Sequence, residues 1–364
     1  MAKILLITHI YPPAVDGGST VIFKFGQYLQ SKGHTIKVLS SNCLSTDDFT
    51  NPSSQHTANG LPVITFLHKP LKFLSKHFPS LKPFTKGPIF PPLSLISFIK
   101  YHPDIIIAGP LPTTIIIYAY IFKKITSAKL FICPCYHPND PDFNNSLLQH
   151  ILKKADFLWC LTDYEKKLLH HPHTIIKGLG VDSNFLIDSA KIKFPKNPHI
   201  VFIGSFSSHK RIELLIAAFN ILKIKYPQLS LTLLGQKTLF FPHLIIPSSV
   251  NLILHPTRSQ IKSAIDNSTL LCLPSIHESF GLVFVESLAR GKPVIGADTP
   301  QTSEVIKLLN GGLTFKTDNL NSLVSTIDRL IQNPKPLGLS GYKYVKNNLT
   351  WDRIGEYLCQ KIGL

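Results

Sequence analysis

The sequence predicts an α/β fold with two domains, each a doubly wound parallel sheet with helices on both faces. Short apolar runs that suit buried strands alternate with helix-like stretches along the chain of 364 residues, which is the pattern of parallel α/β sheets. The second half of the chain repeats the plan of the first half. Residues 191–198, with two prolines and three lysines, are typical of a linker. We therefore expect domains over 1–190 and 199–344, both of ordinary size.

The individual elements follow from apolar runs bounded by turn residues. In the first domain the expected strands are 3–8, 35–41, 104–108, 129–133, 156–162 and 174–180, and the expected helices are 19–31, 113–124 and 163–170. In the second domain the expected strands are 199–206, 229–235, 251–255, 270–275, 292–298 and 311–315, and the expected helices are 213–224, 259–267, 281–289 and 320–332.

The uncharged run 105–122 has nearly the length of a membrane-spanning helix. Gly109 and two prolines interrupt it, so we expect a strand, a turn and a helix with its cap near Thr113 or Thr114. The N-terminal apolar run is too short for a signal peptide and has no cleavage site. Six cysteines without framework spacing favour a reducing compartment. We therefore expect a cytoplasmic protein.

The most informative segment is 277–295, which places two carboxylates around a glycine that opens an apolar helix. Gly281 follows a strand-like run, so a helix begins near it with free backbone N–H groups and its positive dipole end available to a phosphate. Glu278 lies before the helix and Glu286 lies inside it. A phosphate flanked by two hydroxyl-binding carboxylates suggests a nucleotide-sugar site. The alternative is a buried helix with a chance glutamate, but an unpartnered carboxylate on a buried face is costly.

The segment resembles the signature of retaining glycosyltransferases of the GT-B fold, in particular glycosyltransferase family 4. The matching residues are Glu278, Phe280, Gly281, Leu282, Glu286, Gly291, Pro293, Val294 and Ile295. The resemblance implies that Glu278 contacts donor-sugar hydroxyls, that Glu286 holds the ribose hydroxyls, and that backbone amides at 280–282 meet the sugar and phosphates. It also implies two Rossmann-like domains facing across a cleft, with the donor held mainly by the second. A C-terminal helix within 345–364 is expected to pack back on the first domain.

Residues 204–219 resemble the start of the second domain in this family, where a lysine precedes a helix. Gly204 and Lys210 match, and the resemblance implies that the Lys210 ammonium neutralises the leaving diphosphate. Ser205 stands where the family usually has an arginine, and Arg211, beside Lys210, is the candidate to compensate. The alternative for both cations is an ordinary charged helix start. The serine bears on donor affinity and rate rather than on the reaction class.

Two features of the first domain extend the resemblance. Gly17 and Gly18 precede a helix and let backbone N–H groups approach a ligand closely, and in the family this loop faces the donor phosphates and the acceptor. His137 follows the strand 129–133, at the edge where α/β proteins bind ligands, and resembles the family's histidine near the donor sugar. A structural histidine is the alternative. No G-x-G-x-x-G fingerprint follows either opening strand, which argues against a nicotinamide enzyme.

We expect neither a metal ion nor a cofactor. Cys133 and Cys135, with His137 nearby, match no common zinc spacing. Asp140 and Asp142 superficially match the D-x-D metal site of the other large glycosyltransferase fold. Coincidence explains them better, because a lysine and a helix end can balance the diphosphate charge.

The chain is strongly basic, with a net charge of +17, and has no acidic residue between Asp48 and Asp104. The lysines from the middle of this stretch onward are Lys69, Lys72, Lys76, Lys82, Lys86 and Lys100, interleaved with phenylalanines and leucines. This mixture suits an anionic membrane surface, contacted by short segments because six prolines between 70 and 92 exclude one long helix. A solvated basic loop is the alternative, and no nucleic-acid-binding motif accompanies the charge.

Together these features predict a hexosyltransferase that moves a sugar from a nucleoside diphosphate to an acceptor hydroxyl, with retention and without a metal ion. Lys210, Glu278 and His137 are the expected catalytic residues, in an electrostatic and positional mechanism. The basic stretch favours a lipid-linked or surface-glycan acceptor and peripheral docking on the cytoplasmic membrane face. Two alternatives stay open: a GT-B sugar-nucleotide epimerase, whose extra acid–base groups are not found, and a non-catalytic glycosyltransferase-like subunit, suggested by Ser205.

Overall fold

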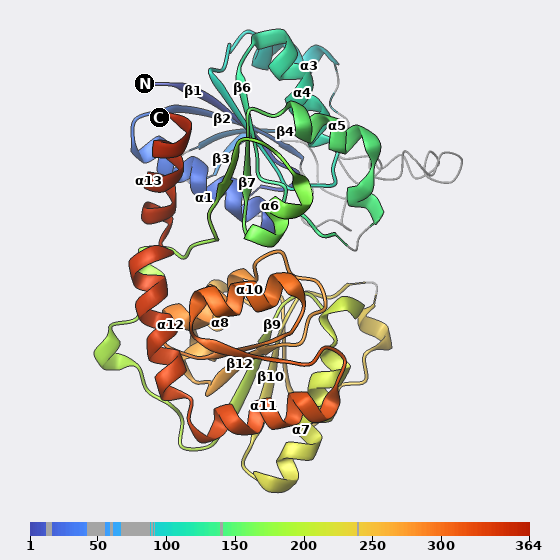
Figure 1. Ribbon diagram of the computed structural model, residues 1–364, viewed down its shortest axis with the longest axis vertical. Helices are drawn as coiled ribbons and strands as arrows, with labels where there is room; N and C mark the ends of the chain where they lie inside the picture. Colours follow the sequence, from blue (N-terminus) through green and yellow to red (C-terminus); the bar gives the residue numbers. More distant parts are fainter. Residues whose placement is uncertain are drawn as a thin grey trace. The chain divides into compact units, whose positions relative to one another are not determined.

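The computed structural model describes residues 1–11, 17–41, 55–58, 61–66, 88, 90, 92–138, 141–238 and 240–364. The chain divides into two compact units (Figure 1): unit 1 contains Met1–Gly178 and Gly355–Leu364, and unit 2 contains Leu179–Ile354. Residues 179–190, which the sequence analysis places in the first domain, are thus part of unit 2, as is the expected linker.

Hydrogen bonds explain why residues 179–190 belong to unit 2. The Phe185 carbonyl accepts a hydrogen bond from the Arg290 guanidinium at 3.0 Å. The Ile187 N–H donates to the Ala289 carbonyl at 3.1 Å, and the Ile187 carbonyl accepts from the Tyr342 hydroxyl at 2.7 Å. These partners are far away in sequence, so the boundary could not be read from local composition.

Unit 1 is built on an eight-stranded sheet in the order β3-β4-β2-β1-β5-β6-β7-β8 (Figure 1). Its strands are β1 (Lys3–Ile7), β2 (Thr35–Ser41), β3 (Gln55–Ala58), β4 (Leu61–Phe66), β5 (Ile105–Ala108), β6 (Lys129–Ile132), β7 (Phe157–Cys160) and β8 (Thr174–Ile176). Neighbours pair in parallel except β3 and β4, which are antiparallel. The strand order reverses between β1 and β5. The carboxyl ends of these strands therefore form the switch point where α/β sheets bind ligands.

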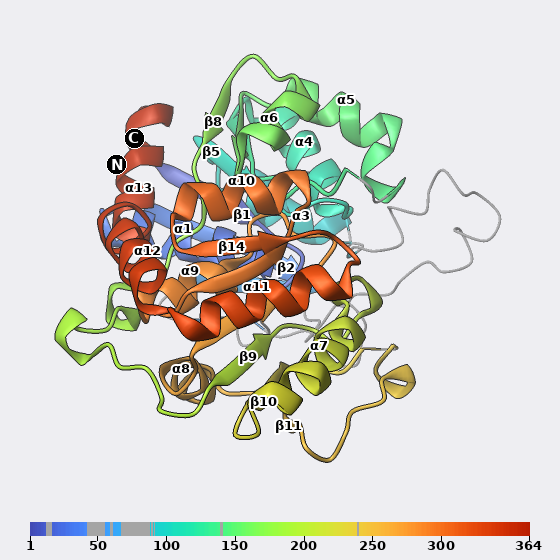
Figure 2. The same ribbon diagram turned by 60° about the horizontal axis from the view of Figure 1, so that its bottom comes forward.

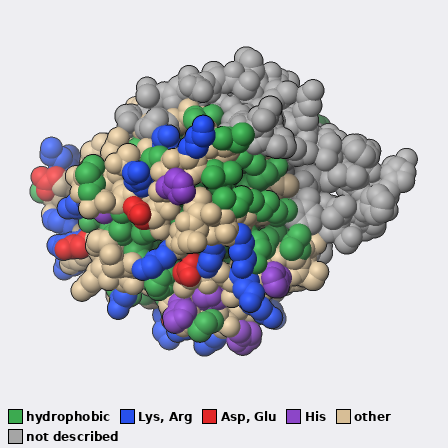
Figure 3. Space-filling view, turned by 90° about the horizontal axis from the view of Figure 1, so that it is seen from above, with side chains coloured by type: hydrophobic (Ala, Val, Ile, Leu, Met, Phe, Trp, Pro, Cys, Tyr) green, Lys and Arg blue, Asp and Glu red, His purple; other side chains and the backbone are tan. Residues whose placement is uncertain are grey.

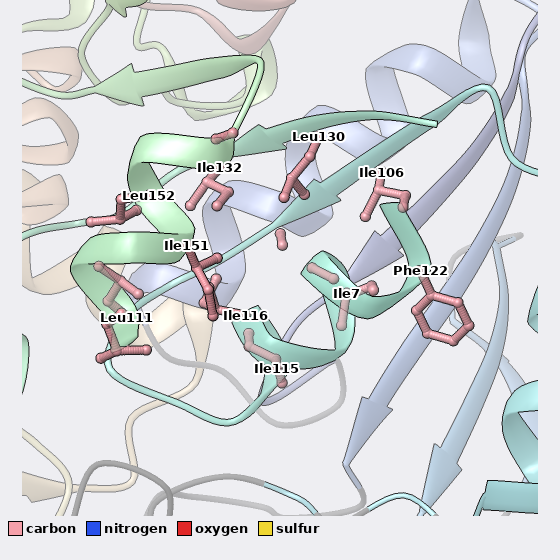
Figure 4. Packing of buried hydrophobic residues seen from close by; sticks show 14 of the residues in the cluster. Ile7, Ile106, Leu111, Ile115, Ile116, Phe122, Leu130, Ile132, Ile151 and Leu152 are labelled. Atoms are coloured by element: carbon pink, nitrogen blue, oxygen red, sulfur yellow. The ribbon is translucent and has the colours of Figure 1, made fainter. Parts of the chain in front are cut away.

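The helices of unit 1 cover this sheet and bury its apolar strands. They are α1 (Gly17–Ser31), α3 (Pro92–Ile99), α4 (Ile115–Thr126), α5 (Ser146–Lys154), α6 (Asp163–Leu169), the 3-10 helix η2 (Pro141–Asn144) and the end of α13 (Trp351–Ile362). Figure 4 shows Ile116 of α4 and Ile151 of α5 close to Ile132 of the sheet. Burying each such side chain contributes roughly 1.5–3 kcal/mol, so these helices are held mainly by their inner faces.

Unit 2 is built on a six-stranded, entirely parallel sheet in the order β11-β10-β9-β12-β13-β14. Its strands are β9 (His199–Ile203), β10 (Ser230–Gly235), β11 (Asn251–Leu254), β12 (Leu270–Leu273), β13 (Val294–Ala297) and β14 (Gly312–Phe315). The strand order reverses between β9 and β12, which is the switch point of this unit.

The helices of unit 2 include the one opened by Gly281. They are α7 (Ile212–Lys225), α8 (Arg258–Asp266), α9 (Leu282–Ala289), α10 (Pro300–Leu309), α11 (Leu320–Gln332), α12 (Lys335–Asn348), the start of α13, and the 3-10 helices η3 (Ser183–Phe185), η4 (Ser189–Lys191), η5 (Ser208–Lys210) and η6 (Phe241–His243). Helices α7 and α11 pack side by side (Figures 1 and 2). Strand, loop and helix alternate as the sequence predicts.

The uncharged run 105–122 forms a strand, a turn and a helix, as expected. β5 ends at Ala108, and α4 begins directly after Thr114. The Thr114 hydroxyl donates to the Pro88 carbonyl at 2.7 Å and makes no cap bond to α4. Across the described part of the chain, no helix combines the length and the apolar character that crossing a membrane requires.

Six of the described strands and α-helices were not expected. Strand β4 extends the sheet beside β2, and β3 lies antiparallel to it at the edge. The other four are the helices α3, α5, α10 and α12, the last of which precedes the C-terminal helix. The lysines predicted to contact a membrane lie mostly outside the described residues, namely Lys69, Lys72, Lys76, Lys82 and Lys86. Lys100 is described and is exposed at the end of α3.

Candidate functional site

The two strands at the switch point of unit 2 are followed by the two segments that the sequence analysis singled out. β9 is followed by Gly204 and η5, and the neighbouring strand β12 is followed by the loop that leads to Gly281 and α9. Parallel neighbours end at the same edge of a sheet, so these two loops meet there.

Hydrogen bonds fasten the two loops together. The His209 carbonyl accepts from the Ile276 N–H at 2.9 Å and from the Ser275 hydroxyl at 3.3 Å. Lys210 follows His209 in the first loop, and Glu278 lies in the second loop. The Lys210 ammonium and the Glu278 carboxylate form an ion pair. Their side chains are only 14% and 12% exposed. The structure thus brings together two of the three predicted catalytic residues.

Gly281 shapes the start of α9. It is the N-cap residue, with φ of +75°, in the left-handed region that glycine tolerates. A Cβ at this position would lie 2.5 Å from the Phe284 ring. Phe280 is buried beside it. The first N–H groups of an α-helix have no partner within the helix, so the amino end of α9 presents donors and a positive dipole end near Glu278.

Glu286 lies one turn into α9 and is buried. Its carboxylate pairs with the Arg258 guanidinium at 2.5 Å, and the two side chains are 4% and 52% exposed. The guanidinium carbon lies 4.2 Å from the centroid of the Phe185 ring. Burial raises the pKa of Glu286, Arg258 acts in the opposite direction, and the Asp182 charge adds a smaller upward effect.

Arg258 was missed by the sequence analysis. It opens α8, directly after Thr257, whose side chain forms a capping box with Gln260. The available signal was its position: β11 ends at the same edge of the sheet as β9, so the start of the next helix belongs to the ligand-binding edge. Nothing local indicates that its partner is a glutamate 28 residues later.

Ser205, which stands where the family usually has an arginine, and its neighbours Gly204 and Arg211 form contacts within unit 2. The Ser205 hydroxyl lies 3.3 Å from the Ser207 hydroxyl. Arg211 adopts a left-handed conformation, and its guanidinium contacts both carboxylate oxygens of Asp318, at 2.9 and 3.2 Å. The Gly204 N–H donates to the Leu234 carbonyl at 2.9 Å. Arg211 is therefore an ion-pair partner of Asp318 in this structure.

The predicted residues of unit 1 lie at the carboxyl edge of its sheet. Gly17 and Gly18 form the start of α1, and a Cβ on Gly18 would lie 2.6 Å from the Pro110 ring, which follows β5. His137 is half-buried in the segment after β6, with its ring centroid 5.4 Å from that of Phe143.

A buried carboxylate that was not predicted supports the segment with His137. Glu165 is fully buried and accepts hydrogen bonds from the N–H groups of Tyr136, at 2.8 Å, and Leu161, at 2.6 Å. It therefore joins the segment after β6 to the one after β7. Its signal in the sequence is the capping position, three residues after Thr162.

The described residues contain no group of three or more His, Cys, Asp or Glu side chains arranged to hold a metal ion. Cys133 and Cys135 are buried, their sulfurs are 3.8 Å apart, and burial raises the pKa of Cys133. Asp142 is buried, and Asp140 lies outside the described residues.

The geometry of unit 2 agrees with a match to a protein family. Residues 185–346, which include both loops, α9 and Arg258, match the family described as Glycosyl transferases group 1. Over this segment, which is less than half of the chain, the protein is similar to the glycosyl transferases group 1. Its relatives by sequence include a glycosyltransferase of Haemophilus influenzae, 27% identical over half of this chain and 53% of the relative.

Another relative is the phosphatidyl-myo-inositol mannosyltransferase of Propionibacterium freudenreichii, which is 22% identical over 67% of this chain and 65% of the relative. The chain thus spans roughly half to two thirds of the length of these relatives.

Solved structures agree on the fold. Sucrose-phosphate synthase from Thermosynechococcus elongatus superimposes with a TM-score of 0.75 at 17% identity, over 100% of this chain and 98% of that one. Anabaena HepE in complex with UDP-glucose gives 0.73 at 16% identity, over the full length of both chains. The expected α/β GT-B fold, with two Rossmann-like parallel-sheet units, is confirmed.

Proposed function

We propose that the protein transfers a hexose from a nucleoside diphosphate sugar to an acceptor hydroxyl, with retention of configuration. The observation that carries this proposal is the Lys210–Glu278 pair beside the amino end of α9, at the switch point of unit 2. An ammonium and a helix end attract a diphosphate, and a carboxylate accepts hydrogen bonds from sugar hydroxyls. The UDP-glucose complex of Anabaena HepE supports the donor class.

In this proposal the ion pair is the unliganded form of the donor site. A poorly hydrated ion pair gains little net stability, so a ligand that offers a better partner to each group can separate it. The diphosphate would take the Lys210 ammonium, and the sugar hydroxyls would take the Glu278 carboxylate. The backbone amides at Phe280, Gly281 and Leu282 would donate to the sugar and the phosphates.

Glu286 is proposed to bind the ribose. Its buried carboxylate can accept hydrogen bonds from two neighbouring hydroxyls, as it now accepts from Arg258. Gly204, Ser205 and Arg211 are the other donor-side residues of the proposal, and Arg211 would act there only after leaving Asp318. For unit 1 we propose Gly17, Gly18 and His137 as substrate contacts.

The chemistry would be electrostatic and positional. The acceptor oxygen forms a bond to the anomeric carbon as the bond from that carbon to the diphosphate oxygen breaks. The acceptor proton passes to the departing diphosphate. The acceptor oxygen attacks the anomeric carbon on the same face from which the diphosphate departs, so the configuration is retained. Lys210 and the amides of α9 stabilise the charge that grows on the diphosphate. A metal ion is not required in this scheme.

We propose a lipid-linked or surface-glycan acceptor, reached by peripheral docking on the cytoplasmic membrane face. The basic composition supports it. The phosphatidyl-myo-inositol mannosyltransferase among the relatives also supports a lipid-borne acceptor.

Donor turnover tests the proposal. The full-length protein is incubated with a panel of UDP-, GDP- and ADP-hexoses, with and without EDTA, and released nucleoside diphosphate is measured. Release of one nucleotide, unaffected by EDTA, is expected. Conversion of the sugar without nucleotide release would instead identify an epimerase. Donor binding with no release, even with candidate glycolipid acceptors, would identify a non-catalytic subunit.

Lys210→Ala gives the sharper test of mechanism. If Lys210 stabilises charge that develops as the diphosphate leaves, kcat should fall by about 10²- to 10³-fold, with a smaller rise in KM. Lys307→Ala, at an exposed position on α10, is the matched control and should behave as wild type. A change in KM alone would mean that Lys210 binds only the ground state.

A further inference from the structure

Three adjacent helices of unit 1 present an outer face of unusual composition. α4 packs against α3 on one side and α5 on the other. Their inner residues, such as Phe98, Phe122 and Leu148, belong to the core of unit 1. The outer residues are not simply polar: Ile96, Ile121, Ile125 and Leu147 are 41–53% exposed. Single exposed apolar residues are common, but here four lie on neighbouring helices.

The charged residues of the same helices all have one sign. The segments 92–100, 115–126 and 146–154 contain no Asp or Glu, and their cations are Lys100, Lys123, Lys124, Lys153 and Lys154. Lys123 pairs with Asp156 at 2.6 Å. The other four lysines are exposed at the carboxyl ends of the helices. Figure 3 views the molecule from above Figure 1 and shows hydrophobic side chains gathered together, with Lys, Arg and His side chains and some Asp or Glu side chains around them.

We propose that this outer face of α3, α4 and α5 docks on the surface of an anionic phospholipid bilayer. Isoleucine and leucine side chains can enter the boundary between headgroups and acyl chains, while lysines on their long stems reach the headgroup phosphates. The described helices offer both groups on one face. The inference deepens the proposed function, because it names the surface through which a lipid-linked acceptor would be reached. Only the identity of the acceptor rests on the proposed function; binding to the bilayer does not.

The composition argues against the other occupants. Protein interfaces are depleted of lysine at their centres. A second copy of this chain, seated through the same face, would bring like charges together. A nucleic acid would use the lysines but would gain nothing from exposed isoleucines, since its binding rests on phosphate contacts.

Vesicle sedimentation of the full-length protein tests the proposal. The bound fraction is measured with vesicles of phosphatidylcholine alone and with vesicles that also contain phosphatidylglycerol, at low and high salt. We expect binding to the anionic vesicles only, weakened by salt. In Lys124→Gln/Lys153→Gln, two cations near the surface are lost, so the partition coefficient should fall about 25-fold, roughly fivefold for each lysine.

Matched controls separate this face from the overall charge. Lys307→Gln/Lys343→Gln removes the same charge from exposed positions of unit 2 and should bind as wild type. Ile121→Ser/Ile125→Ser should lower the partition coefficient at high salt as well, whereas Ile224→Ser, at an 85% exposed position of unit 2, should not. Circular dichroism and the melting temperature check that each variant is folded.

The outcomes that overturn the proposal are distinct. The proposal is wrong if wild-type protein does not bind anionic vesicles at low salt. It is also wrong if the partition coefficient falls equally in the test and control lysine variants. Self-association in sedimentation velocity that Ile121→Ser/Ile125→Ser abolishes, without vesicle binding, would assign the face to a second copy. Nucleotide release by the same samples reports separately on the proposed function, so either can fail while the other stands.

Discussion

At the scale of single residues, Glu286 and Arg258 form an ion pair of very unequal hydration. The carboxylate is 4% exposed and the guanidinium 52%, and the Phe185 ring lies against the guanidinium. Burial raises the pKa of Glu286 while Arg258 opposes the rise. Arg258 therefore limits the rise in the Glu286 pKa that burial causes.

The first prediction concerns the pH dependence of donor binding in Arg258→Gln. Hydroxyls of a ribose donate to an ionised carboxylate, so affinity should fall as the pH drops through the Glu286 pKa. Without the guanidinium this pKa rises further, and the loss should begin at a higher pH than in wild type. Calorimetric titration with a nucleoside diphosphate across the neutral and mildly acidic range measures the shift. Arg329→Gln, at an exposed position on α11, is the control. Parallel pH curves for Arg258→Gln and wild type would contradict this role.

The second prediction concerns Glu286→Gln. The substitution should weaken donor binding by about 1–3 kcal/mol, the value of a hydrogen bond to a buried charged group. Stability should not fall with it. A carboxyl whose folded-state pKa lies above its unfolded value opposes folding increasingly as the pH rises through those two values. Glutamine removes that term, so the melting temperature at neutral pH should be unchanged or higher. Unchanged donor affinity would remove the ribose role.

At the scale of elements, the start of α9 depends on one glycine. Gly281 combines a positive φ with a close approach to the Phe284 ring, and this turn aims the free N–H groups of the helix. The neighbouring Glu278 is reached through the same turn. If the proposed donor site is correct, the geometry of the turn affects folding and donor binding together.

Gly281→Ala tests this turn against a matched glycine. Gly33 has φ of +86°, and a Cβ added there would meet nothing within 4 Å, so Gly33→Ala adds backbone strain alone. Gly281→Ala adds that strain and a contact at 2.5 Å, so we expect the larger loss of stability, about 2–4 kcal/mol against about 1–2 kcal/mol. Denaturant unfolding measures both. Equal losses would mean that Phe284 moves aside freely.

At the scale of the whole molecule, the chain returns to unit 1 through α13. The helix begins in unit 2, and from Gly355 onward it belongs to unit 1. A Cβ on Gly355 would lie 2.3 Å from ring atoms of Tyr28, so α13 and α1 approach at that glycine without room for a side chain.

Gly355→Leu should therefore destabilise unit 1. Overpacking a closed helix contact costs about 1–3 kcal/mol, and the melting temperature should fall accordingly. Gln360→Leu adds the same side chain at an exposed position of the same helix and should leave the melting temperature nearly unchanged. A Gly355→Leu protein as stable as that control would show that α13 is free to shift.

The sequence alone determined much of this protein, because several signals are local. The alternation of apolar runs and helices predicted the α/β class, the interruption of 105–122 predicted a strand, a turn and a helix, and the 277–295 segment predicted a helix opened by Gly281. Periodicity and turn chemistry depend on near neighbours. The same local rules missed β4 and α3, because a proline-rich basic stretch hid their short apolar runs.

Only the tertiary structure decided which groups meet. Lys210 and Glu278 are 68 residues apart, Arg258 and Glu286 are 28 apart, and both pairs form at the carboxyl edge of one sheet. Strand order puts these loops side by side, and that order is set by packing and register across the chain rather than by local pattern. For the same reason Arg211 and Lys210, which are adjacent in sequence, have different partners: Lys210 pairs with Glu278, and Arg211 pairs with Asp318, beyond the end of β14.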